Sequence, residues 1–227
     1  MPYPWLLFFM ALLGMLPFAS SSAPAQVETV EFLDGVEEGA SAQDSVYTIG
    51  TNGYWEAGPV LFVYVSAEQG VDQAAVASAV DLVNSSGNTT VSEWNHLLTS
   101  FEGSVPTLSV TQDASQANIH VMLTDFEHPE GKLGKTRLYT VKGVGQVVSA
   151  QVEIYSASRM HSQGSLEYAL AHELGHALGL SHSTDPGSIM HSVLRLEDGV
   201  VQNHVGSCEQ EGLSALYVDS VVGSVKC

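Results

Sequence analysis

The stretch AHELGHALGLSHS, residues 171–183, contains three of the nine histidines in the chain: His172, His176 and His182. On an α-helix, side chains four positions apart lie on one face, so the imidazoles of His172 and His176 can reach the same cation. Glu173 projects about 100° around the helix axis from His172, so it can stand beside that cation without binding it. The spacing therefore predicts a metal centre on a helix, with a carboxylate next to it.

The third histidine follows a predicted helix end. Gly179 comes three residues after His176, and helices commonly end at a glycine in the left-handed conformation. The chain can then double back and bring His182 to the same cation. Three neutral imidazoles and one water are the ligands of catalytic zinc, whereas structural zinc is usually closed by four protein ligands, often cysteines. No cysteine lies near these histidines. We therefore expect one catalytic Zn²⁺ on the three histidines, with Glu173 as general base.

The same helix, expected over residues 165–179, also carries a core-facing stripe. Ser165 is placed to cap its N-terminus, and Glu167 lies in its first turn. The stripe consists of leucines four positions apart: Leu166, Leu170, Leu174 and Leu178. A core helix needs those leucines but neither the histidines nor Glu173, because buried ionisable groups cost free energy unless they are paired or bound to metal. We therefore expect one face to pack and another to bind metal.

The spacing H-E-x-x-H-x-x-G-x-x-H resembles the signature of the metzincin zinc proteases. Met190 lies eight residues after His182, where metzincins carry the methionine of the Met-turn, which packs beneath the zinc-binding imidazoles. Ser183, directly after the third histidine, makes the segment similar to that of the matrixins, the matrix-metalloproteinase type. Weaker matches extend the resemblance over about residues 54–218: Tyr54-Trp55, Trp94, residues 117–121 and residues 213–217.

The resemblance implies an α+β zincin fold: a twisted five-stranded mixed sheet, an active-site helix, a second long helix and a C-terminal helix. It also implies a protein or peptide substrate that pairs as an added strand with an antiparallel edge of the sheet. We place that edge at residues 146–155 or 137–141. Residue periodicity independently gives the order β-α-β-β-β-α-α, which is typical of a small sheet with helices packed on it.

Three departures from the matrixin pattern limit what can be transferred. No cysteine precedes Cys208, which excludes a cysteine switch, and no recognisable loop supports Ca²⁺ binding. His191 and Ser192 follow Met190 where matrixins continue with Tyr-Pro, so the wall of the specificity pocket differs. Residues 188–191, SIMH, are also similar to the corresponding segment of astacins. Ser192, however, stands where the zinc-binding tyrosine of astacins would be. An astacin-like metzincin and a catalytically dormant matrixin-like binding module are the alternatives to an active endopeptidase.

The composition and the N-terminal segment indicate which partners, location and domain organisation to expect. The 25 acidic residues outnumber the 7 basic ones, so no basic patch for nucleic acid exists. The apolar run of residues 5–18 is too short to span a membrane comfortably and suits a signal peptide. We expect a secreted monomer with a signal peptide at 1–25, a leader or short pro-segment with little structure at 26–50, the catalytic domain at 51–220 and a tail at 221–227. The alternative is a protein tethered by an uncleaved N-terminal segment.

Two further features depend on export. Cys208 and Cys227 can form a disulfide that ties the C-terminal tail to the last helix, or stay as two thiols. Asn84 and Asn88 each begin a glycosylation sequon within one polar stretch, which predicts a surface loop.

Overall fold

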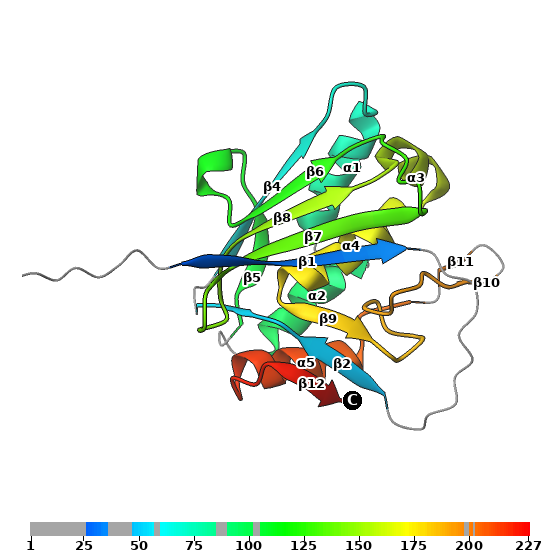
Figure 1. Ribbon diagram of the computed structural model, residues 1–227. Helices are drawn as coiled ribbons and strands as arrows, with labels where there is room; N and C mark the ends of the chain where they lie inside the picture. The colour runs from blue at the N-terminus through cyan, green and yellow to red at the C-terminus, as the bar shows by residue number, and fades with distance from the viewer. Residues whose placement is uncertain are drawn as a thin grey trace, which may run out of the picture.

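The computed structural model describes residues 26–35, 47–56, 60–84, 90–101, 105–197, 200–201 and 203–227. The expected signal peptide, residues 1–25, and the sequon at Asn88 lie outside these ranges. A twisted sheet and the helices that cover one of its faces make up the main body, and a smaller sheet lies beside it (Figure 1). None of the helices in the described ranges is long and apolar enough to cross a bilayer.

Five strands form the body of the main sheet, in the spatial order β5 (Thr107–Val110), β4 (Val60–Ala67), β6 (Ile119–Leu123), β8 (Gln146–Ile154) and β7 (Lys132–Val141). The first four are parallel, and β7 runs antiparallel to β8. A two-residue strand, β3 (Tyr54–Trp55), also pairs with β8. The five-stranded mixed sheet of an α+β fold, as expected from the sequence, is therefore confirmed.

An additional strand, β1 (Val27–Gly35), pairs antiparallel with β7 along its whole length. The expectation of little structure in residues 26–50 is wrong here, and also at β2 (Thr48–Thr51). Val30 and Phe32 pack against the core, while Glu31 between them contacts charged side chains on the other face of the sheet. That two-residue period is typical of a half-buried strand, although the acidic composition of the segment suggested an unfolded leader.

This added strand also corrects the expected position of the open edge. Of the two expected positions, residues 146–155 lie in or next to β8, which is an interior strand, and residues 137–141 lie in β7, which β1 covers. The described strands at the two ends of the sheet path are instead β1 and β5.

Helices α1 (Gln73–Asn84), α2 (Thr90–Thr99) and α4 (Leu166–Ala177) cover one face of the main sheet (Figure 1). The leucine stripe of α4 is buried between the helices and the sheet, as its four-residue spacing predicts. Ser165 stands at the N-cap of α4, but its hydroxyl donates to the carbonyl oxygen of Met160 and does not cap the helix. A short helix that was not predicted from the sequence, α3 (Ala157–Gln163), joins β8 to α4.

Two buried tryptophans fasten α4 to its surroundings. The indole N–H of Trp94, on α2, donates to the carbonyl oxygen of Ala171 at 2.9 Å. The indole N–H of Trp55, on β3, donates to the carbonyl oxygen of Ala177 at 2.8 Å. These bonds hold the helix near its middle and at its C-terminal end, the part that carries His172 and His176.

A second sheet of three strands, in the order β12 (Gly223–Lys226), β2 and β9 (Leu180–Ser183), lies beside helix α5 (Ser207–Tyr217). A disulfide joins Cys208, on α5, to Cys227, directly after β12. The expected tail, residues 221–227, contains the strand β12. A short hairpin of β10 (Leu196–Glu197) and β11 (Val200–Val201) precedes α5.

Candidate metal centre

Two of the three expected metal ligands lie on the buried side of α4. His172 and His176 are one turn apart, with their ring centroids 4.7 Å from each other. His182 comes from β9, and its ring centroid lies 5.6 Å from that of His172 and 5.0 Å from that of His176. One ring nitrogen from each residue lies within 4.8 Å of the other two. Within the described residues, this is the only group of three or more ligand-type side chains with such spacing.

Gly179 makes the turn that brings His182 to the other two histidines. Its φ is +101°, in the region that favours glycine. A Cβ atom at this position would also overlap the carbonyl oxygen of Gly53. The end of α4 at a left-handed glycine, inferred from the sequence, is thus seen in the structure, and β9 starts at the next residue.

Backbone carbonyls orient two of the imidazoles. The Nδ1 atom of His172 lies 2.5 Å from the carbonyl oxygen of Ile189, and that of His176 lies 2.8 Å from the carbonyl oxygen of Leu180. Because a carbonyl oxygen only accepts, each Nδ1 must carry the proton, and each Nε2 then has a lone pair for a metal. Three imidazoles, two of them fixed in the metal-binding tautomer, fit Zn²⁺.

Met190, the candidate for the Met-turn, packs against α4. Its side chain is fully buried, and a Cβ atom at Gly175 would overlap its sulfur. Gly175, between Glu173 and His176 in sequence, therefore lets Met190 approach the helix directly below the metal centre. The preceding residue, Ile189, supplies the carbonyl that orients His172, so this turn supports the site through both a side chain and its backbone.

A buried carboxylate that was not predicted from the sequence holds this turn in place. Glu209, at the start of α5, is fully buried and accepts hydrogen bonds from the hydroxyl of Ser188 and from the backbone N–H of Met190 and Gly206. Asn203 adds a bond from its side-chain amide to the carbonyl oxygen of Ser188 at 2.9 Å. The only sequence signal for Glu209 is its place as an acidic residue in the first turn of a helix. Such a residue stabilises the N-terminus of the helix, but this pattern does not predict a hydrogen bond to Ser188, 21 residues away.

Glu173, the expected general base, is 1% exposed. One oxygen of its carboxylate accepts a hydrogen bond from the hydroxyl of Thr136, on β7, at 2.5 Å. Gly134 makes room for the same carboxylate, because a Cβ atom there would overlap it. Neither β7 residue was predicted from the sequence, since no local pattern connects them to a helix 37 residues later.

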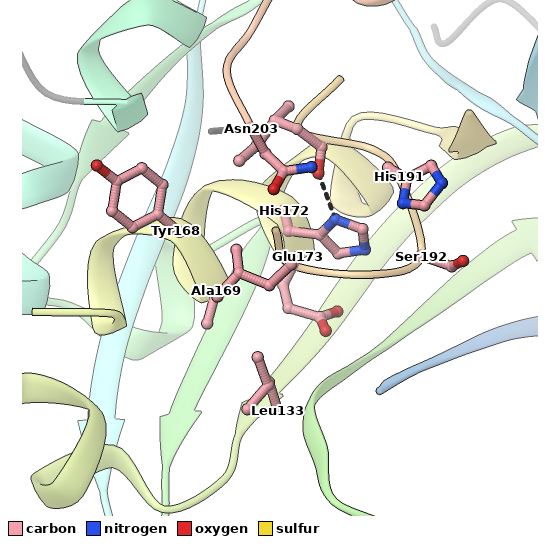
Figure 2. Close-up of a pocket in the computed structure, with 10 residues that line it drawn as sticks. Leu133, Tyr168, Ala169, His172, Glu173, His191, Ser192 and Asn203 are labelled. Carbon is pink, nitrogen blue, oxygen red and sulfur yellow. Dashed lines mark hydrogen bonds between the residues drawn. The ribbon is translucent and has the colours of Figure 1, made fainter. Parts of the chain in front are cut away.

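A small, mostly apolar pocket opens beside His172 and Glu173 (Figure 2). Its apolar lining comes from three segments: Leu133 of β7, Tyr168 and Ala169 of α4, and Ile189 and Leu194 of the loop after β9. His191 and Ser192, which stand where the matrixin pattern has Tyr-Pro, also line it (Figure 2). The residues that departed from the expected pattern thus form part of the pocket wall.

The strand β1 contacts the three-histidine cluster through Phe32. The ring of Phe32 stacks on the imidazole of His176, with centroids 4.2 Å apart and planes 5° apart. Next to it, Glu31 forms ion pairs with Lys135 at 2.6 Å and with Arg137 at 2.8 Å. The hydrogen bonds from these two cations, Lys135 first, lower the pKa of the Glu31 carboxyl below its ordinary value of 4.5.

Asn84, the first of the two candidate glycosylation sites, is exposed at the last residue of α1. Its position at a helix end, next to residues 85–89, agrees with a surface location.

Residues 110–218 match the family model of the matrixins. The matched region contains the three converging histidines, Glu173 and Met190, together with the strands β6, β7 and β8. The match supports a matrixin-like metzincin catalytic domain that includes this region. The matrixin family uses zinc and cleaves proteins, which supports a function of the metalloprotease type.

Proposed function

We propose that this chain, with its matrixin-like catalytic region, is a secreted zinc endopeptidase in which His172, His176 and His182 bind one zinc ion. The observation that carries the proposal is the convergence of three imidazoles beside the carboxylate of Glu173, within reach of a single cation. Backbone acceptors already fix the tautomers of two of the rings, which is typical of prepared metal ligands.

In the proposed reaction, Glu173 is the group that moves the proton. The chemistry that zinc supplies when bound is Lewis-acid polarisation of the scissile carbonyl and of the attacking water. The carboxylate of Glu173 takes the proton from that water and later passes it to the leaving amine. The hydroxyl of Thr136 donates to the carboxylate and fixes its orientation, so that fewer conformations compete with the productive one.

The pocket next to Glu173 supports a preference for the side chain that flanks the cleaved bond. Its walls are mostly apolar, and the polar groups at His191 and Ser192 lie on one side (Figure 2). We therefore expect an apolar side chain of modest size in this pocket.

Removal of the general base tests the proposal. We expect Glu173→Gln to retain one zinc per chain, measured by native mass spectrometry, and to lose at least a thousandfold in kcat on a mixed peptide library, since both proton transfers depend on this carboxylate. The control is Glu211→Gln, which neutralises an exposed carboxylate on α5. Chelator-sensitive cleavage by the wild type and by the control supports the function. Cleavage by Glu173→Gln at the wild-type rate contradicts it.

A further inference from the structure

The strand β1 pairs with the side of β7 that would otherwise be a free edge of the sheet. The register is continuous from Val27 opposite Val141 to Asp34 opposite Gly134. The backbone N–H and C=O groups of β7 that bond to β1 are unavailable to any other strand, because a sheet edge pairs with one strand at a time. A peptide can add to β7 only after β1 has left it.

The position of β1 along β7 places it over the reacting groups. Phe32 is paired with Thr136, and the hydroxyl of Thr136 holds the carboxylate of Glu173. The Phe32 ring, 8% exposed, covers the imidazole of His176. A bound peptide and β1 would therefore compete for the same space above the metal centre, as well as for the same hydrogen bonds.

The charges of the two strands are complementary. Although the formal net charge of the chain is −18, three of its seven basic residues lie in β7 and a fourth follows directly: Lys132, Lys135, Arg137 and Lys142. Lys135 and Arg137 both bind Glu31. Arg137 also bridges to Glu153 on β8 at 2.8 Å, which holds its guanidinium in place on the outer face of the sheet. The cations of the molecule are thus concentrated where β1 pairs.

We propose that β1 is a tethered, displaceable occupant of a peptide-binding edge on β7, and that the vacated edge selects extended peptides with an acidic residue followed by an aromatic one. Lys135 and Arg137 recognise the acidic side chain, and the surface of the His176 imidazole receives the aromatic ring. The inference rests on the proposed function, since it takes the β7 edge to be where a substrate strand binds.

The contacts between β1 and β7 are weak enough for β1 to leave the sheet. The pairing of β1 is to one strand only, and its ion pairs are partly exposed to solvent, where such pairs contribute little individually. The other neighbour of β7, β8, stays paired when β1 departs, so the sheet itself need not unfold.

The test uses variants of the full chain. Phe32→Asp removes the ring from His176, Glu31→Lys reverses the charge opposite Lys135 and Arg137, and Glu28→Lys makes the same charge reversal at an exposed position of the same strand. Hydrogen exchange of the β7 amides is measured, with β6 as an internal reference for intact folding. We expect at least tenfold faster exchange in β7 for the first two variants, and no change for Glu28→Lys or in β6.

A second measurement addresses recognition. A fluorescent peptide with the sequence of residues 26–35, QVETVEFLDG, is titrated into the Phe32→Asp variant and into the wild type. We expect it to bind the variant at least tenfold more tightly than the wild type, and we expect a peptide with lysine at the position of Glu31 to bind the variant at least tenfold more weakly.

The outcomes separate this inference from the proposed function, because neither measurement depends on catalysis. Faster β7 exchange together with selective peptide binding supports the inference, whether or not a variant cleaves peptides. Cleavage that also rises in the two opened variants supports both proposals. Unchanged β7 exchange in Phe32→Asp and Glu31→Lys overturns the inference, as does equal binding of the two peptides.

Discussion

The hydroxyl of Thr136 lies 2.5 Å from one carboxylate oxygen of Glu173, so β7 of the main sheet holds the acidic side chain of α4. Loss of a hydrogen bond to a charged group costs about 1.5–3 kcal/mol. We expect Thr136→Val, which keeps the side-chain shape, to lower kcat roughly tenfold to a hundredfold, with zinc content unchanged. Thr140→Val, at a buried threonine of the same strand, is the control. Equal kcat values for the two variants would show that the bond has no part in catalysis.

Gly179 combines a positive φ with a close approach, and its replacement should affect both stability and metal binding. Gly179→Ala strains the backbone and pushes the new Cβ into the carbonyl of Gly53. We expect the free energy of unfolding to fall by more than about 2 kcal/mol and zinc affinity to fall with it, because His182 follows three residues later. Chemical denaturation and zinc titration measure the two effects.

Gly143→Ala is the matched control for that variant. Gly143 has a φ of +78°, but a Cβ atom added there would meet nothing within 4 Å, so this variant isolates the backbone strain. We expect it to cost only about 1 kcal/mol and to leave zinc affinity unchanged. A similar loss of zinc affinity in both variants would rule out a specific role for the Gly179 turn.

Glu209, which is distant in sequence but hydrogen-bonded to Ser188 and Met190, should stabilise the turn at Met190. Glu209→Gln keeps the size of the side chain but replaces one accepting oxygen by an amide that cannot accept from a backbone N–H. We expect a loss of about 1–3 kcal/mol in the free energy of unfolding, measured by chemical denaturation, whereas Glu211→Gln on the same helix should have no effect. A neutral result for Glu209→Gln would mean that the surrounding donors find other partners.

The contact between β1 and β7 should weaken in acid. Lys135 and Arg137 lower the pKa of Glu31 in the folded protein, so its stabilising contribution is fully present above the ordinary value of 4.5 and is lost as the pH falls through the lower folded-state pKa. Glu153, which shares Arg137, is the other charged group in this cluster. We expect protection of the β7 amides, corrected for intrinsic exchange, to decline below about pH 4.5.

The Glu31→Gln chain provides the comparison for this pH dependence. It lacks the titrating carboxyl, so the decline in protection should be smaller in this variant, and its β7 amides should already be less protected at pH 7. An identical pH profile in the two chains would assign the acid effect to other groups.

Zinc removal should destabilise the protein, because a ligand that binds only the folded state adds to its stability. At a free concentration of zinc one hundred times its Kd, that contribution is about 2.7 kcal/mol. We expect a chelator to lower Tm in the wild type but to have a much smaller effect on His176→Ala, as followed by calorimetry. An equal decrease in both would indicate that the metal acts elsewhere in the chain.

Local sequence patterns predicted the elements of the site that lie close together along the chain. His172, Glu173 and His176 share one helix, and Gly179 has the conformation that its place in the pattern implies. Helical and strand periodicity likewise predicted a sheet with helices packed on it, since burial imposes a period on each element. These features follow from contacts over a few residues.

The features that were missed depend on contacts between distant segments. Thr136 and Gly134 reach Glu173 only because β7 packs against α4. Glu209 reaches Ser188 only because the start of α5 lies against the loop after β9. The strand β1 was expected to be an unstructured leader because acidic residues suggested solvation, whereas its charge is in fact matched by Lys135 and Arg137 across the sheet. No local period encodes such a match, which arises only once the two strands are paired.

The disulfide between Cys208 and Cys227 bears on the metal centre through the small sheet. His182 lies on β9, β9 pairs with β2, and β2 pairs with β12, whose end the disulfide fastens to α5. His176 lies on α4, but its Nδ1 bonds the carbonyl oxygen of Leu180 on β9, whereas His172 is oriented by Ile189, outside this sheet. We therefore expect reduction of the disulfide to disturb His182, which lies on β9 itself, more than His172, although neither cysteine belongs to the histidine cluster.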